Sequence, residues 1–306
     1  ISRGDLQRQP WAALPGSAPA YERPFDQVPR GATVRVDLKP FEGIPAVESA
    51  NEPRDVVLGP LAPDAAPEPD APLPIDPERF AFPSLSSFDL DTYGALEQDV
   101  EAPLLLAPGG RLALRAGRID LNADIRIPSG AVVLRTELDP DLILNVFQQP
   151  NAPIDVAGTV AVDLSGQWVN DDPLQQRPGS GLAPLFLQGG TFDLAANGDA
   201  LVRTGARIDV NGGAWLDASG RLTGGDAGAV SVRSTFPRLG RTGLFATLSG
   251  LAVEGRAGGR LAFAGNSILI SDVVEQQDPL PLVPLPLPDA PTPEPESGVP
   301  PFPAPV

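Results

Sequence analysis

The residues that could carry out chemistry in this chain are few, because three reactive types are missing. The sequence of 306 residues has no cysteine, no histidine and no methionine. Without cysteine there is no disulfide, no thiolate nucleophile and no thiolate zinc site. Without histidine the commonest general base is missing, and the serines have no imidazole to activate them. We therefore predict that the chain is not an enzyme and that it has no catalytic residue, metal site or cofactor.

One carboxylate pair invites a comparison with glycosidases. Asp171 and Asp172 follow Trp168 and Asn170, and a pair of carboxylates is what glycosidic bond cleavage requires. Adjacent residues of a strand point to opposite faces, however, so these two carboxylates are poorly placed to act on the same glycosidic bond. We expect Trp168, Asn170 and Asp171 to form a structural corner. A polysaccharide-acting enzyme is kept as the less favoured alternative.

A second expected corner contains a glycine pair. Gly212 and Gly213 lie between predicted strands and precede no helix, so they do not form a phosphate-binding loop. We expect them to form a structural corner together with Trp215. The three tryptophans of the chain are too few and too scattered to predict a carbohydrate platform.

Two further motifs suggest ligands. Arg3, Gly4 and Asp5 spell the tripeptide that integrins recognise, which makes them a minor candidate for interaction. Six aspartates sit inside or just after predicted strands and would form an acidic stripe, able to hold Ca²⁺, if they shared one face. Because stacked like charges repel, some of them must face arginines. These aspartates are Asp120, Asp155, Asp163, Asp193, Asp209 and Asp217.

The overall charge and hydropathy exclude two classes of partner. The formal net charge is −17, and such an acidic chain repels phosphate backbones, so we predict no nucleic-acid partner. The sequence contains no apolar run of about 18 residues, so we predict no membrane span. No secretory signal is recognisable at its start, and we expect any export signal to be removed or to lie elsewhere.

The elements that must position these residues fall into three zones. Residues 1–100 are expected to be irregular and proline-rich, with seven prolines between Gly59 and Pro77. Residues 101–278 are expected to fold as one β domain. Residues 279–306 form a proline-rich tail, where helices and central strands are excluded.

The middle zone repeats a short phrase that begins with glycine and alternates apolar and polar residues, which is the signal of a strand. The copies are GRLALRAG, GAVVLRT, GTVAVDLSG, GTFDLAANG, GAVSVRS and GRLAFAG, starting at Gly110, Gly130, Gly158, Gly190, Gly228 and Gly259. A second phrase, RIDLN at residues 118–122, returns as RIDVN at 207–211. Such repetition predicts an all-β parallel β-helix, because equivalent coils stack about 4.8 Å apart. A sandwich or barrel is the alternative.

A β-helix makes specific predictions for single residues. Apolar ladders should point inward, at Leu112/Leu114, Val160/Val162, Val230/Val232 and Leu261/Phe263. Glycine and asparagine should supply corners with positive φ, where a β-branched residue would be strained.

The stretch VDLSGQWVND at residues 162–171, with the glycine-rich phrases up to residue 232, resembles the shaft of filamentous-haemagglutinin-like exoproteins. This resemblance covers about residues 104–272. It implies a right-handed parallel β-helix, export through an outer-membrane partner of two-partner secretion, and a location outside the bacterial cell or on its surface. It transfers no catalytic residue. The amino-terminal secretion domain of that family is not recognisable in this chain.

From these observations we expect a non-enzymatic segment of a secreted surface exoprotein. Its β-helical rod would be structural and adhesive, in contact with host cells or glycans. One alternative is a subunit of an extracellular filament, because the ends of stacked coils are open sheet edges on which a second copy could stack.

Overall fold

The computed structural model describes residues 32–39, 54–60, 71–77, 85–137, 152–170, 186–217, 219–235 and 240–265. By its internal contacts the chain divides into Ile1–Ile270 and Ser271–Val306, and every described residue belongs to the first unit. The tripeptide Arg3-Gly4-Asp5, Asp171 and the proline-rich tail lie outside the described residues.

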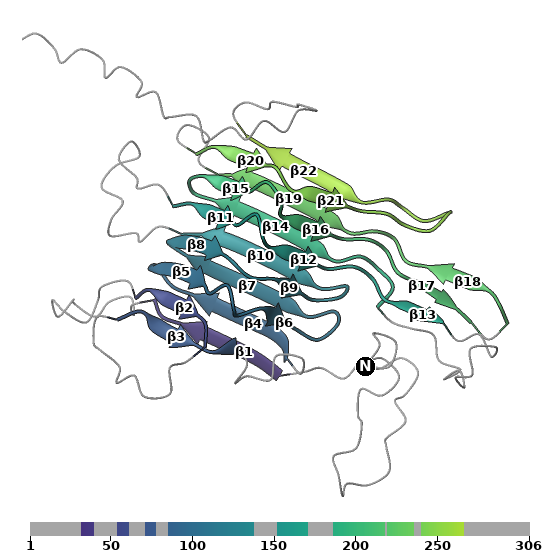
Figure 1. Ribbon diagram of the computed structural model, residues 1–306, viewed down its shortest axis with the longest axis horizontal. Coiled ribbons are helices and arrows are strands. Elements are labelled where there is room, and N and C mark those ends of the chain that lie inside the picture. The colour runs from purple at the N-terminus through teal and green to yellow at the C-terminus, as the bar shows by residue number, and fades with distance from the viewer. Residues whose placement is uncertain are drawn as a thin grey trace, which may run out of the picture. The chain divides into compact units, whose positions relative to one another are not determined.

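Three sheets of parallel strands make up most of the described chain (Figure 1). Sheet A contains β1 (Ala32–Asp37), β4 (Leu85–Asp91), β7 (Arg111–Ala116), β10 (Ala131–Thr136), β14 (Thr191–Ala196), β19 (Ala229–Ser234) and β22 (Arg260–Ala264). Sheet B contains, in spatial order, β20 (Thr242–Leu244), β15 (Ala200–Val202), β11 (Ile154–Val156), β8 (Arg118–Leu121), β5 (Ala95–Gln98), β2 (Val56–Leu58) and β3 (Leu73–Ile75). Sheet C contains β21 (Thr247–Ser249), β16 (Arg207–Asp209), β12 (Ala161–Asp163), β9 (Ile125–Arg126) and β6 (Leu104–Leu105).

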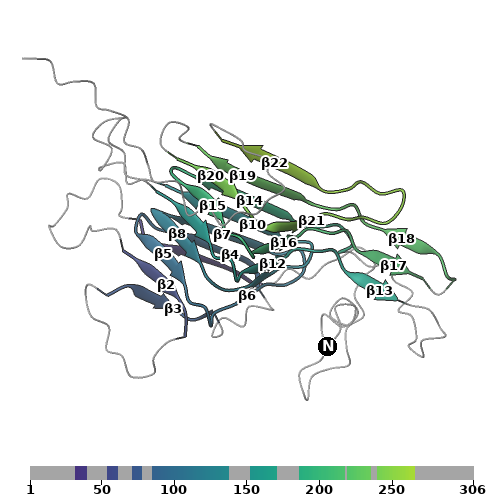
Figure 2. The same ribbon diagram turned by 45° about the horizontal axis from the view of Figure 1, so that its top comes forward.

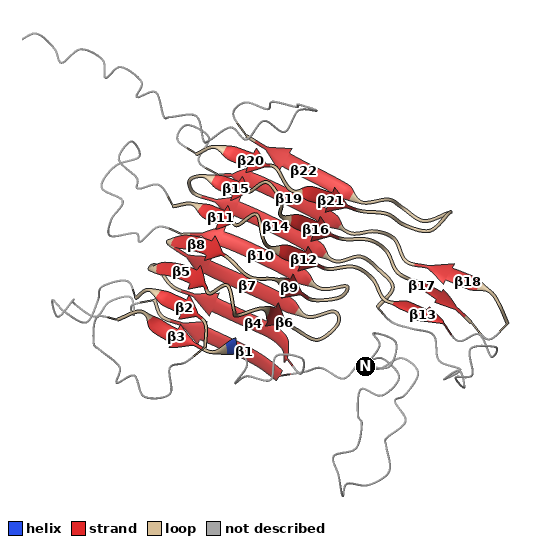
Figure 3. Ribbon diagram, viewed as in Figure 1, coloured by secondary structure: helices blue, strands red, loops and turns tan. Residues whose placement is uncertain are grey.

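The chain visits these sheets in a repeating order, from A to B to C and back to A. For example, β4, β5 and β6 are followed by β7, which pairs in parallel with β4. The described residues contain almost no helix (Figure 3). The predicted fold class is confirmed: the chain is all-β and its coils stack as a parallel β-helix, which we call the stack.

The interior of the stack is made of apolar columns that run across the coils. In sheet A, one inward column is Val34, Phe88, Leu112, Val132, Phe192, Val230 and Leu261. Its five central members are at most 3% exposed. Burying one such side chain contributes roughly 1.5–3 kcal/mol. The predicted inward pairs at 112/114, 160/162 and 230/232 are confirmed, and Val160 and Val162 are buried at sheet C rather than in this column. In the fourth pair Leu261 is 56% exposed and Phe263 is half-buried.

Close approach of neighbouring coils requires the glycines that open the repeated phrase. Gly110, Gly130, Gly190 and Gly228 each precede a strand of sheet A. A Cβ on Gly190 would lie 2.1 Å from the carbonyl oxygen of Gly130, and one on Gly228 would lie 1.7 Å from that of Gly190. None of these glycines has a positive φ. The prediction that glycine supplies positive-φ corners is confirmed at four other glycines, while no described asparagine does so; the four are Gly109, Gly205, Gly220 and Gly255. At the glycines that open the phrase, the missing side chain matters instead.

The stack also includes parts of the segment that we expected to be irregular. Strands β1 to β5 lie within residues 1–100 and continue sheets A and B. The proline-rich stretch before Pro77 contributes β3, with Pro74 at its centre. Proline is tolerated there because β3 is the last strand of sheet B and its outer edge needs no donor in the sheet.

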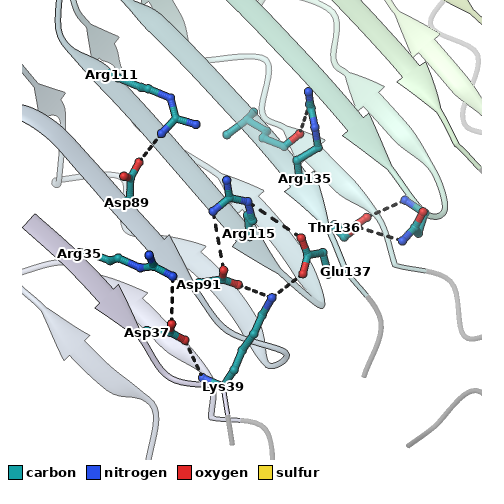
Figure 4. Close-up of polar contacts among 12 residues, drawn as sticks. Arg35, Asp37, Lys39, Asp89, Asp91, Arg111, Arg115, Arg135, Thr136 and Glu137 are labelled. Atoms are coloured by element: carbon teal, nitrogen blue, oxygen red, sulfur yellow. Dashed lines mark hydrogen bonds and ion pairs between the residues drawn. The ribbon is translucent and has the colours of Figure 1, made fainter. Parts of the chain in front are cut away.

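A charged cluster connects four neighbouring coils, those of β1, β4, β7 and β10, on the outer face of sheet A (Figure 4). The Nζ atom of Lys39 lies 2.7 Å from Oδ1 of Asp91 and also contacts Glu137, while the Lys39 ammonium sits 4.8 Å from the ring centroid of Tyr93. Arg115 approaches the same two carboxylates at 3.7 and 4.0 Å. Burial on its own lowers the pKa of Lys39, but its contacts with Asp91 and Glu137 outweigh burial and raise this pKa above its ordinary value.

In the described part of the chain, no helix has the length and apolar character needed to cross a membrane.

Candidate functional site

Three long turns leave the stack on the same side, between sheet C and sheet A. They comprise residues 164–170 with 186–190, residues 210–228, and residues 250–259. The equivalent turns of earlier coils, 106–110 and 127–130, have only five and four residues. The long turns carry a separate sheet of β13 (Trp168–Asn170), β17 (Ala214–Leu216) and β18 (Leu222–Gly224). This structure, which we call the lateral arm, stands apart from sheets A, B and C in both views (Figures 1 and 2).

The base of the lateral arm is held by backbone contacts that only glycine permits. The N–H of Gly213 donates to the carbonyl of Leu187 at 2.6 Å, and that of Gly166 donates to the carbonyl of Asn211 at 2.7 Å. A Cβ on Gly213 would lie 2.0 Å from the carbonyl oxygen of Gln167, and one on Gly212 would lie 2.2 Å from that of Gly225. The predicted corner glycines therefore lie where two arm turns pack backbone against backbone.

The tip of the arm is a hairpin whose turn is stabilised by hydrogen bonds to an aspartate. Strands β17 and β18 are antiparallel, unlike the strands of the stack. Oδ1 of Asp217 accepts hydrogen bonds from the Ser219 hydroxyl at 2.6 Å and from the N–H groups of Ser219 and Arg221 at 2.8 and 2.9 Å. Gly220 supplies the positive φ of +81° in this turn. The Ser219 hydroxyl, followed by these backbone donors, lowers the pKa of Asp217 below its usual range.

One face of the arm sheet presents apolar side chains to solvent. Trp168 lies opposite Ala214, and Asn170 lies opposite Leu216, which in turn pairs with Leu222. Because alternate residues of a strand share a face, Trp168, Asn170, Leu216 and Leu222 all lie on the same side. Trp168 is 61% exposed and Leu222 is 54% exposed. We call these four residues the arm face.

The two tryptophans of the arm occupy neighbouring strands but different faces. Trp215 pairs with Val169, so it points to the side of the sheet opposite Trp168, where it is half-buried. Trp168 and Trp215 therefore lie on neighbouring strands although they are far apart in the sequence. Their rings point to opposite faces of the arm sheet, so they cannot form one carbohydrate platform. Trp168 alone offers its ring to a partner.

A buried glutamine at the arm base was missed by sequence reasoning. Gln167 is fully buried, and neither its Oε1 nor its Nε2 has a hydrogen-bond partner. A buried amide without partners is costly, at roughly 1–3 kcal/mol. Gln167 and Val169 are buried and alternate with the exposed Trp168 and Asn170, but a polar side chain at an inward position gives no hydrophobic signal in the sequence.

The six aspartates that would form an acidic stripe if they shared one face are distributed over several sheets. Asp120 and Asp155 stack on sheet B, and Asp163 and Asp209 stack on sheet C. Asp193 lies on sheet A, and Asp217 lies in the arm turn. The condition for a single acidic stripe is therefore not met, because the repeated phrases enter different sheets. The prediction that some of these aspartates face arginines is confirmed, since Asp120, Asp155, Asp163 and Asp193 each form an ion pair with an arginine.

An open groove of about 470 Å³ lies over the outer face of sheet B, beside Glu97, Asp120 and Asp155. Nε of Arg118 donates to Asp120 at 2.7 Å, and Nε of Arg203 donates to Asp155 at 2.7 Å. The arginines therefore neutralise two of the three carboxylates. Among the described residues, no group of acidic side chains is arranged to hold a metal ion.

Comparison with known proteins adds no relative to this description. No protein-family model, no curated protein and no solved structure matches the chain. The resemblance to filamentous-haemagglutinin-like exoproteins thus depends on the quoted phrases alone and stays a prediction.

Proposed function

We propose that this chain is a segment of a non-enzymatic bacterial exoprotein, secreted or held at the cell surface, whose lateral arm makes adhesive contacts. In this proposal the stack is a stiff support and the arm face is the contact surface. Export of the parent chain through an outer-membrane secretion partner is part of the same proposal, and it is supported by the sequence resemblance.

The observation that carries the proposal is the exposure of Trp168. A tryptophan that is 61% exposed leaves most of a large apolar ring in water. Trp168 is not on a free loop, because β13 pairs with β17 and its preceding residue is fully buried. A rigidly held aromatic ring loses little conformational entropy on binding, which suits a contact residue.

The chemistry of the arm face fits a glycan at a host-cell surface. The indole ring of Trp168 offers an apolar face on which the C–H side of a sugar ring can stack, together with an N–H donor. The Asn170 side chain, on the same side, has an amide with both donors and an acceptor for hydroxyl groups. The Arg256 side chain of the turn 250–259 also reaches this side, because its Cγ lies 3.2 Å from the Cβ position of Gly224, which pairs with Ala214.

A single contact of this kind would be weak. Adhesive proteins overcome this by presenting many copies, since linked contacts raise avidity by a factor of about 10²–10⁴. A stack of coils that repeats in the parent chain would offer such an array.

The test is binding of the full chain, immobilised at high density, to a panel of glycans and to cultured animal cells. We expect binding that Trp168→Ala reduces at least tenfold. Phe245→Ala is the matched control, because Phe245 is an aromatic residue of the stack with a similar exposure of 57%. Equal binding by native chain and Trp168→Ala, or turnover of a polysaccharide, would contradict the proposal.

A further inference from the structure

Both ends of the stack present strand edges together with apolar side chains. At the end that contains β1 and β3, which we call the first end, Val34, Val36 and Leu73 are only half-buried. At the opposite end, which we call the last end, Leu261 of β22 is 56% exposed. An apolar sheet edge is a template on which another chain can add strands. Two such ends on one molecule would let copies of the chain associate end to end.

Strand β3 is the outermost described strand at the first end. β1 pairs with β4 and β2 pairs with β5, so β1 and β2 belong to the same coil. β3 pairs with β2 on the side away from β5, which places it one coil further out than β1. A second copy that approached the first end would therefore reach the edge of β3 before that of β1.

The hydrogen bonds of β3 show which of its residues face outward. The N–H of Leu73 donates to the carbonyl of Asp55 at 2.8 Å, and the carbonyl of Ile75 accepts a hydrogen bond at 3.0 Å from the residue that follows β2. Residues 73 and 75 therefore direct their backbone groups toward β2. Because successive residues of a strand direct these groups to opposite sides, Pro72 and Pro74 face the outer edge.

These two outward residues have no N–H to offer an added strand. Proline lacks this donor, and its ring fills the space where the hydrogen would be. A strand that paired with the outer edge of β3 would bury carbonyl groups beside Pro72 and Pro74 without a donor, which is costly. Both prolines are exposed, so nothing else in the described chain uses this edge.

The placement of these prolines is selective. The chain has 38 prolines, yet β3 is the only one of the 22 described strands that contains one. Sheet C has a related feature at the first end, because the N–H of Leu104 in β6 donates to the carbonyl of Asp124 at 2.9 Å and Pro103 before it faces the outer edge. At the last end no outward strand residue is a proline; these residues are Thr242, Leu244, Leu248, Leu261 and Phe263.

Sheet A has charged residues instead of prolines at the first end. Arg35 and Asp37 of β1 form an exposed ion pair at 3.2 Å. Charged side chains on an edge strand also discourage pairing with another chain. The edges of all three sheets at the first end thus carry features that oppose the addition of a strand.

We propose that β3 is a cap strand, in which Pro72 and Pro74 prevent a second copy of this chain from adding its strands to the first end. The chain then stays a single rod although both of its ends are apolar. This inference is independent of the contact proposed for the lateral arm. It opposes the alternative of a filament that grows through the first end.

The test restores the missing donors in the full chain. Pro72→Thr combined with Pro74→Thr gives both outward residues an N–H, and threonine is common in strands. We expect the native chain to sediment as a monomer and the double variant to associate with a constant at least tenfold higher, which corresponds to about 1.4 kcal/mol. Analytical ultracentrifugation over a range of concentrations measures this. Pro60→Thr is the matched control, because Pro60 is an exposed proline in the turn after β2 and its replacement restores no donor on β3.

Hydrogen exchange shows whether the association uses β3. In the associated double variant the amides at positions 72 and 74 should exchange at least tenfold more slowly than in its diluted monomer. Retained protection of β7 shows that the variant is folded, and Pro74→Thr alone takes its place if that protection is lost.

Three results would overturn the proposal. One is a folded variant that stays as monomeric as the native chain. Another is a native chain, or a Pro60→Thr variant, that associates as strongly as the double variant. The third is association that leaves the amides at positions 72 and 74 in rapid exchange, since the copies would then meet elsewhere.

Discussion

The stack and the lateral arm consist of the same short strands, but different interactions hold them. In the stack, parallel strands enclose apolar columns such as the one that runs from Phe88 to Val230, and these side chains are at most 3% exposed. In the arm, three strands have no enclosed column, and Trp168 and Leu222 face solvent. Backbone contacts at Gly212 and Gly213 hold the turns of the arm together at its base instead. The stack therefore uses its apolar side chains for stability, whereas the arm leaves apolar side chains exposed, where they are free to contact a partner.

The largest effect is expected in the stack. Leu114 is fully buried between Leu90 and Leu134 in the second inward column of sheet A. Leu114→Ala should lower the free energy of unfolding by about 2–5 kcal/mol through lost burial and a cavity. Urea denaturation followed by circular dichroism measures this. Val133→Ala, which removes a half-buried side chain from the outer face, should cost less than about 1 kcal/mol. Equal losses would mean that the columns do not form the core.

The next effect should be confined to the arm. Gly213→Val places side-chain atoms where the carbonyl oxygen of Gln167 lies, 2.0 Å from the Cβ position. Overpacking of this kind typically costs about 1–3 kcal/mol. We expect faster hydrogen exchange in residues 214–224, with protection in β7 and β10 retained. Gly258→Ala is the control, because its Cβ would lie 3.9 Å from the nearest backbone atom and should change neither region. Loss of protection throughout sheet A would show that arm and stack are one unit.

A third variant should stabilise the arm base. Gln167→Leu removes two buried amide atoms that have no partners, and it should raise the free energy of unfolding by about 1–3 kcal/mol. Gln98→Leu is the matched control, because its Nε2 donates to the carbonyl of Ala102 at 2.8 Å and only its Oε1 lacks a partner. Gln98→Leu should raise the free energy of unfolding by less than Gln167→Leu does, or should lower it. A destabilised Gln167→Leu variant would contradict this interpretation of the arm base.

The smallest effect concerns the charged cluster on the stack. Lys39→Met should reduce stability by about 1 kcal/mol or less, since partly exposed ion pairs contribute little. Because the folded state raises the pKa of Lys39, this contribution is complete below the unfolded value of about 10.4. It is lost as the pH rises through the folded pKa. Urea midpoints of both proteins between pH 7 and 11 measure it, with Arg35→Met, in an exposed pair, as the control. A stability difference between the native chain and Lys39→Met that grows above pH 10 would contradict the raised pKa of Lys39.

The repeated phrases predicted where strands begin, but they could not assign strands to sheets. RIDLN forms β8 in sheet B, whereas the nearly identical RIDVN forms β16 in sheet C. Both phrases offer an inward isoleucine and an outward aspartate, and the three faces of the stack accept this pattern equally. Which sheet a phrase enters depends on the length of the preceding turns, and those lengths vary from coil to coil.

Long-range contacts could not be predicted for a related reason. Lys39 contacts Glu137, which is 98 residues away, because three coils and their turns separate the two in sequence. The arm sheet brings Trp168 beside Ala214 in the same way. Local alternation gives the face of each strand, but it contains no information on which coil will lie next to it.

Hydrogen–deuterium exchange of the native chain, resolved by mass spectrometry, tests most directly whether stack and arm are stabilised separately. We predict the slowest exchange in β7, β10 and β14, which pair on both sides and carry the buried columns. Residues 214–224 of the arm should exchange at least tenfold faster, through local opening that leaves the stack folded. Exchange of both regions at one common rate, with one common response to urea, would contradict the account.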